Sequence, residues 1–128
     1  MVSEITHNIK VSVECVFSSQ HSSVLQNQFA FFYHITIENL GDFSVRLLRR
    51  KWIIVDAHGS ERQVEGEGVV GVQPSLPPSD QHEYTSSCLL STPFGVMRGN
   101  YTFERLMDGQ LFTVSIPEFK LEVPYLLS

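Results

Sequence analysis

The pattern that most constrains the fold is a two-residue alternation of apolar and polar side chains. Near the start of the chain, apolar residues occupy every second position, and the polar Lys10, Ser12 and Glu14 lie between the first four of them. The apolar residues are Ile9, Val11, Val13, Cys15 and Phe17. The same period continues through residues 29–38. Such a period places the apolar side chains on one face of a β-strand. No stretch of the chain repeats apolar residues at helical spacing, so the sequence predicts an all-β fold.

Further strands are predicted wherever the alternation returns between turn sequences. They cover residues 45–56, 60–65, 81–90, 99–107, 110–116 and 119–125. The apolar parity changes within residues 45–56, which indicates a β-bulge. Pro117 and Pro124 are expected to mark the ends of the last strand. Seven or eight short antiparallel strands separated by turns are typical of a β-sandwich.

Length and charge limit the class of protein. With 128 residues, the chain is expected to form a single domain over residues 1–128. Its formal net charge of −5 argues against a general nucleic-acid binder. The apolar runs are too short to span a membrane, and the first residues do not resemble a signal peptide. A cytoplasmic protein is expected, in which Cys15 and Cys88 stay reduced.

The segment Gly66–Gly71 spells G-x-G-x-x-G, a pattern found in phosphate-binding loops. In a dinucleotide-binding fold a helix follows the glycines, but here Pro74, Pro77 and Pro78 follow. A kinase-type loop is excluded as well, because the other kinase signatures are missing. The motif therefore needs another interpretation.

Three interpretations of this loop stay open. The glycines can serve only to allow a tight turn. They can bind a phosphate, in which case the candidate residues are Gly66, Gly68, Gly71, Arg49 and Arg50. The loop can also dock a protein partner, in which case the candidates are its apolar residues Val69, Val70, Val72 and Leu76.

Four of the nine basic residues gather within six positions, Arg46, Arg49, Arg50 and Lys51. On a regular strand they would divide between two faces, and only a bulge could bring more of them together. The favoured interpretation is a strand edge that charge protects from aggregation. The alternative is a site for an anion or an acidic partner.

The sequence offers no catalytic residue, metal site or cofactor site that we can assign. Several acidic and imidazole side chains occur without the spacing of a metal motif, namely Asp56, His58, Asp80, His82 and Glu83. Cys15 lies on an apolar strand face, and Ser86 lies outside any nucleophile-elbow sequence. Four residues of one predicted strand share a face, His82, Tyr84, Ser86 and Cys88, without a sign of activation. The chain is therefore not expected to be an enzyme.

Several unusual strings occur in a recognisable order. Residues 47–59 read LLRRKWIIVDAHG, residues 64–74 read VEGEGVVGVQP, and residues 92–101 read TPFGVMRGNY. Residues 112–119 then read FTVSIPEF. From about Ile9 to Leu121, this order closely resembles the bacterial ApaG family, also called CorD. Val72 departs from the family pattern, in which a polar residue is common, and Cys88 occupies a position that is usually not a thiol.

The resemblance implies a fibronectin type III-like or immunoglobulin-like β-sandwich with the glycine motif in an inter-strand loop. It also implies a non-enzymatic protein-interaction module, and the family names connect it with cobalt and magnesium resistance. The expected partner is an unidentified protein, or a second copy that pairs through an edge strand. The alternative is a pyrophosphate or dinucleotide binder that uses the Gly66–Gly71 loop, with Arg49, Arg50 or Arg62 brought near by folding. Mg²⁺ would offset the nearby glutamates. A third hypothesis, direct binding of Co²⁺ or Mg²⁺, ranks below both.

Overall fold

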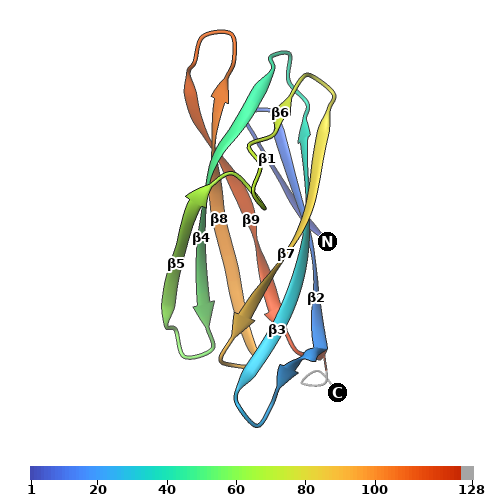
Figure 1. The fold of residues 1–128 in the computed structure, drawn as a ribbon, viewed down its shortest axis with the longest axis vertical. Helices are drawn as coiled ribbons and strands as arrows, with labels where there is room; N and C mark the ends of the chain where they lie inside the picture. The colour runs from blue at the N-terminus through green and yellow to red at the C-terminus, as the bar shows by residue number, and fades with distance from the viewer. Residues whose placement is uncertain (125–128) are drawn as a thin grey trace.

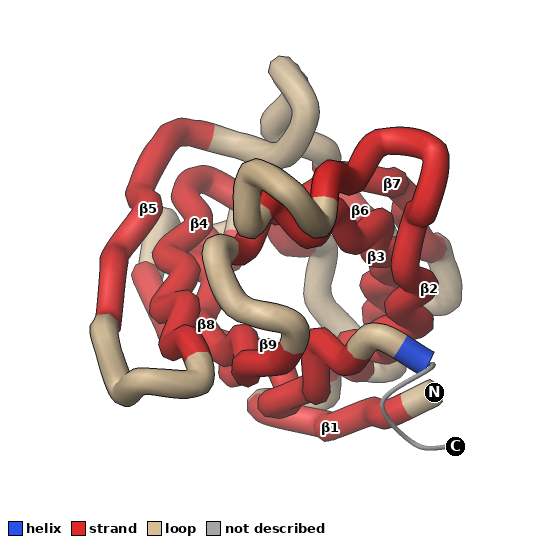
Figure 2. Tube along the Cα trace, turned by 90° about the horizontal axis from the view of Figure 1, so that it is seen from below, coloured by secondary structure: helices blue, strands red, loops and turns tan. Residues whose placement is uncertain are grey.

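The computed structural model describes residues 1–124 and consists of two antiparallel β-sheets packed face to face (Figure 1). The strands within this part of the chain are β1 Val2–Thr6, β2 Ile9–Ser23, β3 Gln28–Asn39, β4 Val45–Asp56, β5 Glu61–Glu67, β6 Ser75–Leu76, β7 Gln81–Leu90, β8 Phe94–Arg105 and β9 Leu111–Glu122. One sheet has the order β1-β2-β3-β7. The other has the order β5-β4-β8-β9, and β6 pairs with β4. Figure 2 shows one sheet on each side of the molecule.

The predicted all-β sandwich is confirmed, and strands β4 and β7 have the predicted bounds. Strand β8 begins at Phe94, five residues before the expected start at Gly99. Two strands were not expected at all. Strand β1 pairs with the start of β2 but is exposed along most of its length, so its sequence lacks the alternation of a half-buried strand. Strand β6 has only two residues.

The expectation that Pro117 ends a strand is wrong, because β9 runs through it without interruption. The register between β8 and β9 shifts at this point, so that Pro117 and Glu118 lie opposite Arg98. A bulge of this kind accommodates proline because the ladder does not need its missing N–H. Strand β9 ends at Glu122, and the expected end at Tyr125 lies outside the described residues.

The predicted bulge in β4 is confirmed. Leu47 pairs with Phe103 and Arg49 pairs with Thr102, so Leu48 is the extra residue. The bulge reverses the parity of the strand. Side chains at odd positions, such as Leu47, face the core before the bulge, and even positions do so after it.

The core lies between the two sheets and contains most of the large apolar side chains. At its centre, Tyr33, Trp52 and Phe119 pack edge to face or tilted, with ring centroids 5.3–5.9 Å apart. Cys88 is buried at this level and Cys15 is half-buried, and both thiols are free. No helix in residues 1–124 is long and apolar enough to cross a membrane.

Candidate functional site

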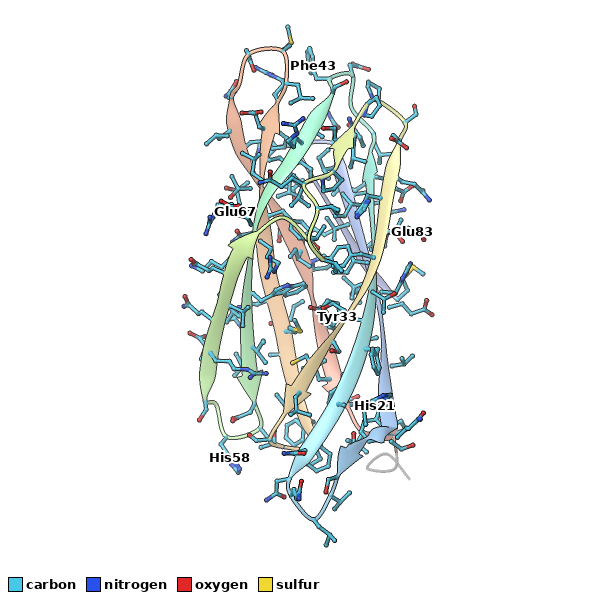
Figure 3. The ribbon with its side chains drawn as sticks, viewed as in Figure 1. His21, Tyr33, Phe43, His58, Glu67 and Glu83 are labelled. Carbon is cyan, nitrogen blue, oxygen red and sulfur yellow. The ribbon has the colours of Figure 1, made fainter. Side chains whose placement is uncertain are left out.

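The glycine loop, defined here as residues 66–72, leaves the end of edge strand β5 and turns back within two residues. Figure 3 shows Glu67 at this end of β5. The Val69 N–H donates to Val72 O at 2.8 Å, and the Val72 N–H donates to Val69 O at 3.1 Å. Between them, Val70 and Gly71 both have positive φ, 46° and 81°. These values describe a two-residue hairpin turn of type I′, in which Asn-Gly is the preferred sequence.

Gly68 is required because a side chain there would collide with the backbone, whereas Gly66 packs against the end of a flexible side chain. A Cβ on Gly68 would lie 2.2 Å from the carbonyl oxygen of Val72, and Gly68 also has a φ of +64°. A Cβ on Gly66 would lie 2.8 Å from the guanidinium of Arg50. The motif therefore has a structural explanation that needs no ligand.

Arg50 holds the loop from the inner face of β4. Its Nη1 donates to the carbonyl oxygens of Glu67 at 3.0 Å and Gly68 at 3.1 Å. Deeper in the core, the hydroxyls of Tyr84 and Tyr101 hydrogen-bond to each other. Burial raises the pKa of both hydroxyls, so they stay protonated and act only as hydrogen-bonding groups.

The loop in this conformation is poorly prepared to receive a phosphate. Three of its amides already donate to carbonyl oxygens, those of Gly68, Val69 and Val72. Arg50 is near the loop but faces its carbonyls rather than its amides. Arg49 lies opposite Glu67 in the ladder and is exposed on the outer face of the sheet. The structure thus brings Gly66, Gly68 and Arg50 together but does not bring Arg49 to them.

The four apolar residues considered for partner binding divide into two pairs. Val69 and Leu76 are buried in the core, at 0% and 2% exposure. Val70 and Val72 are 64% and 47% exposed. The apolar surface that the loop offers to a partner therefore belongs to Val70 and Val72.

The bulge in β4 brings three of the four basic residues to one face. Arg46, Arg49 and Lys51 have exposed or half-buried positions on the outer face, whereas Arg50 faces the other sheet. Lys51 pairs with Glu65 at 3.8 Å. The favoured interpretation of a protected strand edge is wrong, because β4 pairs with β5 on one side and with β8 on the other. The outer face of the sheet carries mixed charge at this place.

Strand β7 carries the polar row that the sequence suggested. His82, Tyr84, Ser86 and Cys88 alternate with exposed residues and face the interior. On the opposite face, the His34 imidazole hydrogen-bonds to Glu83, and this contact lowers the pKa of the carboxyl. Burial raises the pKa of the Cys88 thiol, which opposes formation of a nucleophilic thiolate.

Arg62, named with Arg49 and Arg50 for the phosphate-binding alternative, makes a contact between the sheets that was not predicted. Arg62 of β5 reaches across to the other sheet, where its Nη2 donates to the carbonyl oxygen of Leu89 at 2.6 Å. The sequence signal for this contact was the position of Arg62 in the alternation of side chains along β5. Arg62 shares a strand face with Val64, opposite to the three glutamates of β5. Among residues 1–124, no three His, Cys, Asp or Glu side chains gather to hold a metal ion.

Comparisons with known proteins agree on one family. The model of the ApaG domain matches residues 19–105. The chain is 46% identical over 117 residues to Protein ApaG of Shewanella denitrificans, covering 91% of this chain and 92% of that protein. It is 43% identical over 119 residues to Protein ApaG of Salmonella arizonae, covering 91% and 93%. The crystal structure of the putative ApaA protein from Bordetella pertussis superposes with a TM-score of 0.87 at 40% identity, covering 91% and 94%.

Proposed function

The chain belongs to the ApaG domain family, and we propose that it is a non-enzymatic protein-interaction module whose contact surface includes the tip of the glycine loop. The observation that carries this proposal is the conformation of Val70. A β-branched residue is an outlier at positive φ, yet Val70 has this backbone and exposes most of its side chain. Strained, exposed apolar residues are common at sites that bind other molecules.

The rest of the loop supports a docking role. Hydrogen bonds from Arg50 and from the amides of Gly68 and Val72 fix the backbone of the loop. The loop can therefore bind a partner with little loss of conformational freedom. Val72 lies beside Val70 in the turn and enlarges the apolar tip. Hydrogen bonds within the protein use three of the loop amides that could otherwise bind a phosphate, which is why we place protein binding first.

We also propose a cytoplasmic location and, following the family names, a role in tolerance of cobalt and magnesium. The free thiols of Cys15 and Cys88 agree with a reducing compartment. In this proposal the protein affects metal tolerance by binding a partner protein, and it does not bind the metal ions itself.

Site-specific crosslinking in bacterial cells tests the proposal. A photoreactive phenylalanine analogue replaces Val72 in one variant and His58 in a control, since His58 lies on the hairpin between β4 and β5 at the other end of β5 (Figure 3). The Val72 variant should form a discrete adduct with another protein, and the additional change Val70→Asn should abolish it. Equal adduct patterns from both positions would refute a contact at the loop.

A further inference from the structure

The outer edge of β7 is open. Strand β7 pairs with β3 over ten residues without a bulge, and no other strand within residues 1–124 pairs with it. The carbonyl of Leu89 accepts a bond from Arg62 of the other sheet, so it points away from β3. In an antiparallel ladder every second residue directs its backbone groups to the same side. The N–H and C=O groups of Glu83, Thr85 and Ser87 therefore face the open edge as well.

The usual protection of an edge strand is missing along most of β7. Residues 84–90 contain no charged residue and no proline. The other sheet shows the contrast, because its edge strand β5 carries Glu61, Glu65 and Glu67. An unprotected edge of this length is a template for an added strand.

The basic and acidic side chains of β5 lie on opposite faces of that strand. Opposite Ile54 and Trp52 in the ladder lie Arg62 and Val64, so these two residues share the side of β5 that faces β7. The glutamates of β5 lie on the alternate face, where Glu61 pairs with Arg98. A molecule that approaches the β7 edge between the sheets thus meets an arginine and a valine rather than the acidic face.

Arg62 has no carboxylate partner among the ion pairs of the described residues. It lines a pocket of about 440 Å³ together with Ile54, Leu89 and Leu90. Two carboxylates also line this pocket, but both are engaged. Asp56 accepts bonds from the backbone of its own turn, and Glu61 pairs with Arg98. Arg62 is the cation that lines this pocket, and within the part of the chain that the structure describes its guanidinium is bonded only to uncharged acceptors, Leu89 O and Cys88 Sγ.

We propose that the β7 edge binds an extended acidic segment of a partner protein, which adds to the sheet as a further strand. The backbone of the segment bonds to Glu83, Thr85 and Ser87, and one of its carboxylates pairs with Arg62. In the unbound protein the Arg62 guanidinium donates to Leu89 O. When the segment binds, Arg62 turns to the carboxylate, and Leu89 O accepts a bond from an amide of the added strand. The proposal rests on the proposed function, because it names the binding mode and the chemistry of the partner.

A library of random ten-residue peptides, displayed on phage, is the probe. Selection on the full chain should enrich sequences that contain Asp or Glu and lack proline. Fluorescence anisotropy then gives the affinity of the recovered peptides, and ¹⁵N–¹H spectra locate the bound peptide. The largest amide shifts should fall on Glu83, Thr85 and Ser87. Recovery of no peptide, of basic peptides, or of peptides that shift only the glycine loop would overturn the proposal.

Two variants and one control sharpen the test. Arg62→Glu should weaken the recovered acidic peptides by about ten-fold or more. Gln63→Glu places a carboxylate on the outer face of β5 one residue away, keeps the arginine, and should leave the affinity unchanged. Thr85→Pro removes an amide that faces the open edge, so it should abolish binding while keeping the ladder with β3. If this variant fails to fold, the pair Arg62→Glu and Gln63→Glu decides alone.

The outcomes separate this inference from the proposed function. Crosslinks from Val72 without any peptide on β7 would leave the protein-interaction role standing and refute the strand addition. Acidic peptides on β7 without crosslinks from Val72 would support the edge and refute the loop contact. A dimer of the chain that Thr85→Pro dissolves would show that a second copy is the occupant, which would overturn the choice of an acidic segment.

Discussion

Replacing Val70 by asparagine should stabilise the protein, although it removes an apolar side chain. Val70 occupies the first central position of the type I′ turn with a φ of 46°. This backbone costs an L-residue roughly 1–2 kcal/mol, and asparagine tolerates it far better than valine. Val70 is 64% exposed, so the lost burial is about a third of the 1.5–3 kcal/mol of a fully buried valine, or about 0.5–1 kcal/mol.

The balance is a rise of about 0.5–1 kcal/mol in the free energy of unfolding, which corresponds to an increase in Tm of about 2–5 °C for a domain of this size. Urea and thermal unfolding followed by circular dichroism would measure both quantities. Val72→Asn is the matched control, because Val72 is a similarly exposed valine without positive φ, and it should not stabilise. Equal or lower stability of Val70→Asn than of the control would refute the assignment of strain to Val70.

The remaining predictions concern the glycine loop, an ion pair and a thiol. Gly71→Ala should cost about 1–2 kcal/mol of unfolding free energy in urea titrations, because only its backbone is strained, whereas Gly68→Ala should cost clearly more because its Cβ would also strike a backbone carbonyl. Asp108→Asn should destabilise the protein at neutral pH, since the hydrogen bond from Arg105 lowers the pKa of this carboxyl in the folded state. Denaturation at a series of pH values should show this deficit shrinking as the pH falls below 3.8, the ordinary value, and through the lower folded pKa. Burial raises the pKa of Cys15 from 9.0 to about 11, so iodoacetamide at pH 8 should label it about a hundredfold more slowly in the native than in the unfolded chain, as read by mass spectrometry.

The fold could be predicted wherever one face of a strand is buried and the other is exposed. This condition holds for β7 and for β3 from Phe31 onward, where burial alternates residue by residue. It fails for β1, where four of five residues are exposed and nothing in the sequence marks the strand. The strand end predicted at Pro117 is wrong for a different reason. Its tolerance depends on a register shift relative to Arg98, which belongs to the neighbouring strand and cannot be read locally.

The loop could be located from its glycines and prolines, but the roles of its residues could not be assigned. Val69 and Val70 are adjacent and chemically identical, yet one is buried and the other is exposed. The direction of the turn decides between them, and that direction depends on the bonds that Arg50 and Leu48 O make to the loop. The contact of Arg62 could not be predicted, because its partner, the carbonyl of Leu89, lies on the other sheet.

Strand β9 joins the two sheets, because it pairs with β8 and also lies against β1 and β2. The amide of Ser115 donates to the Thr6 hydroxyl, a contact that spans 109 positions of the chain. Ribosomes add about 5–20 residues per second, so the first strands wait for roughly 5–20 s before their closing strand is synthesised. Throughout that interval the nascent chain exposes the apolar faces that β9 later covers. The sandwich must therefore close after β9 has been synthesised, and until then the chain is a natural client for ribosome-associated chaperones.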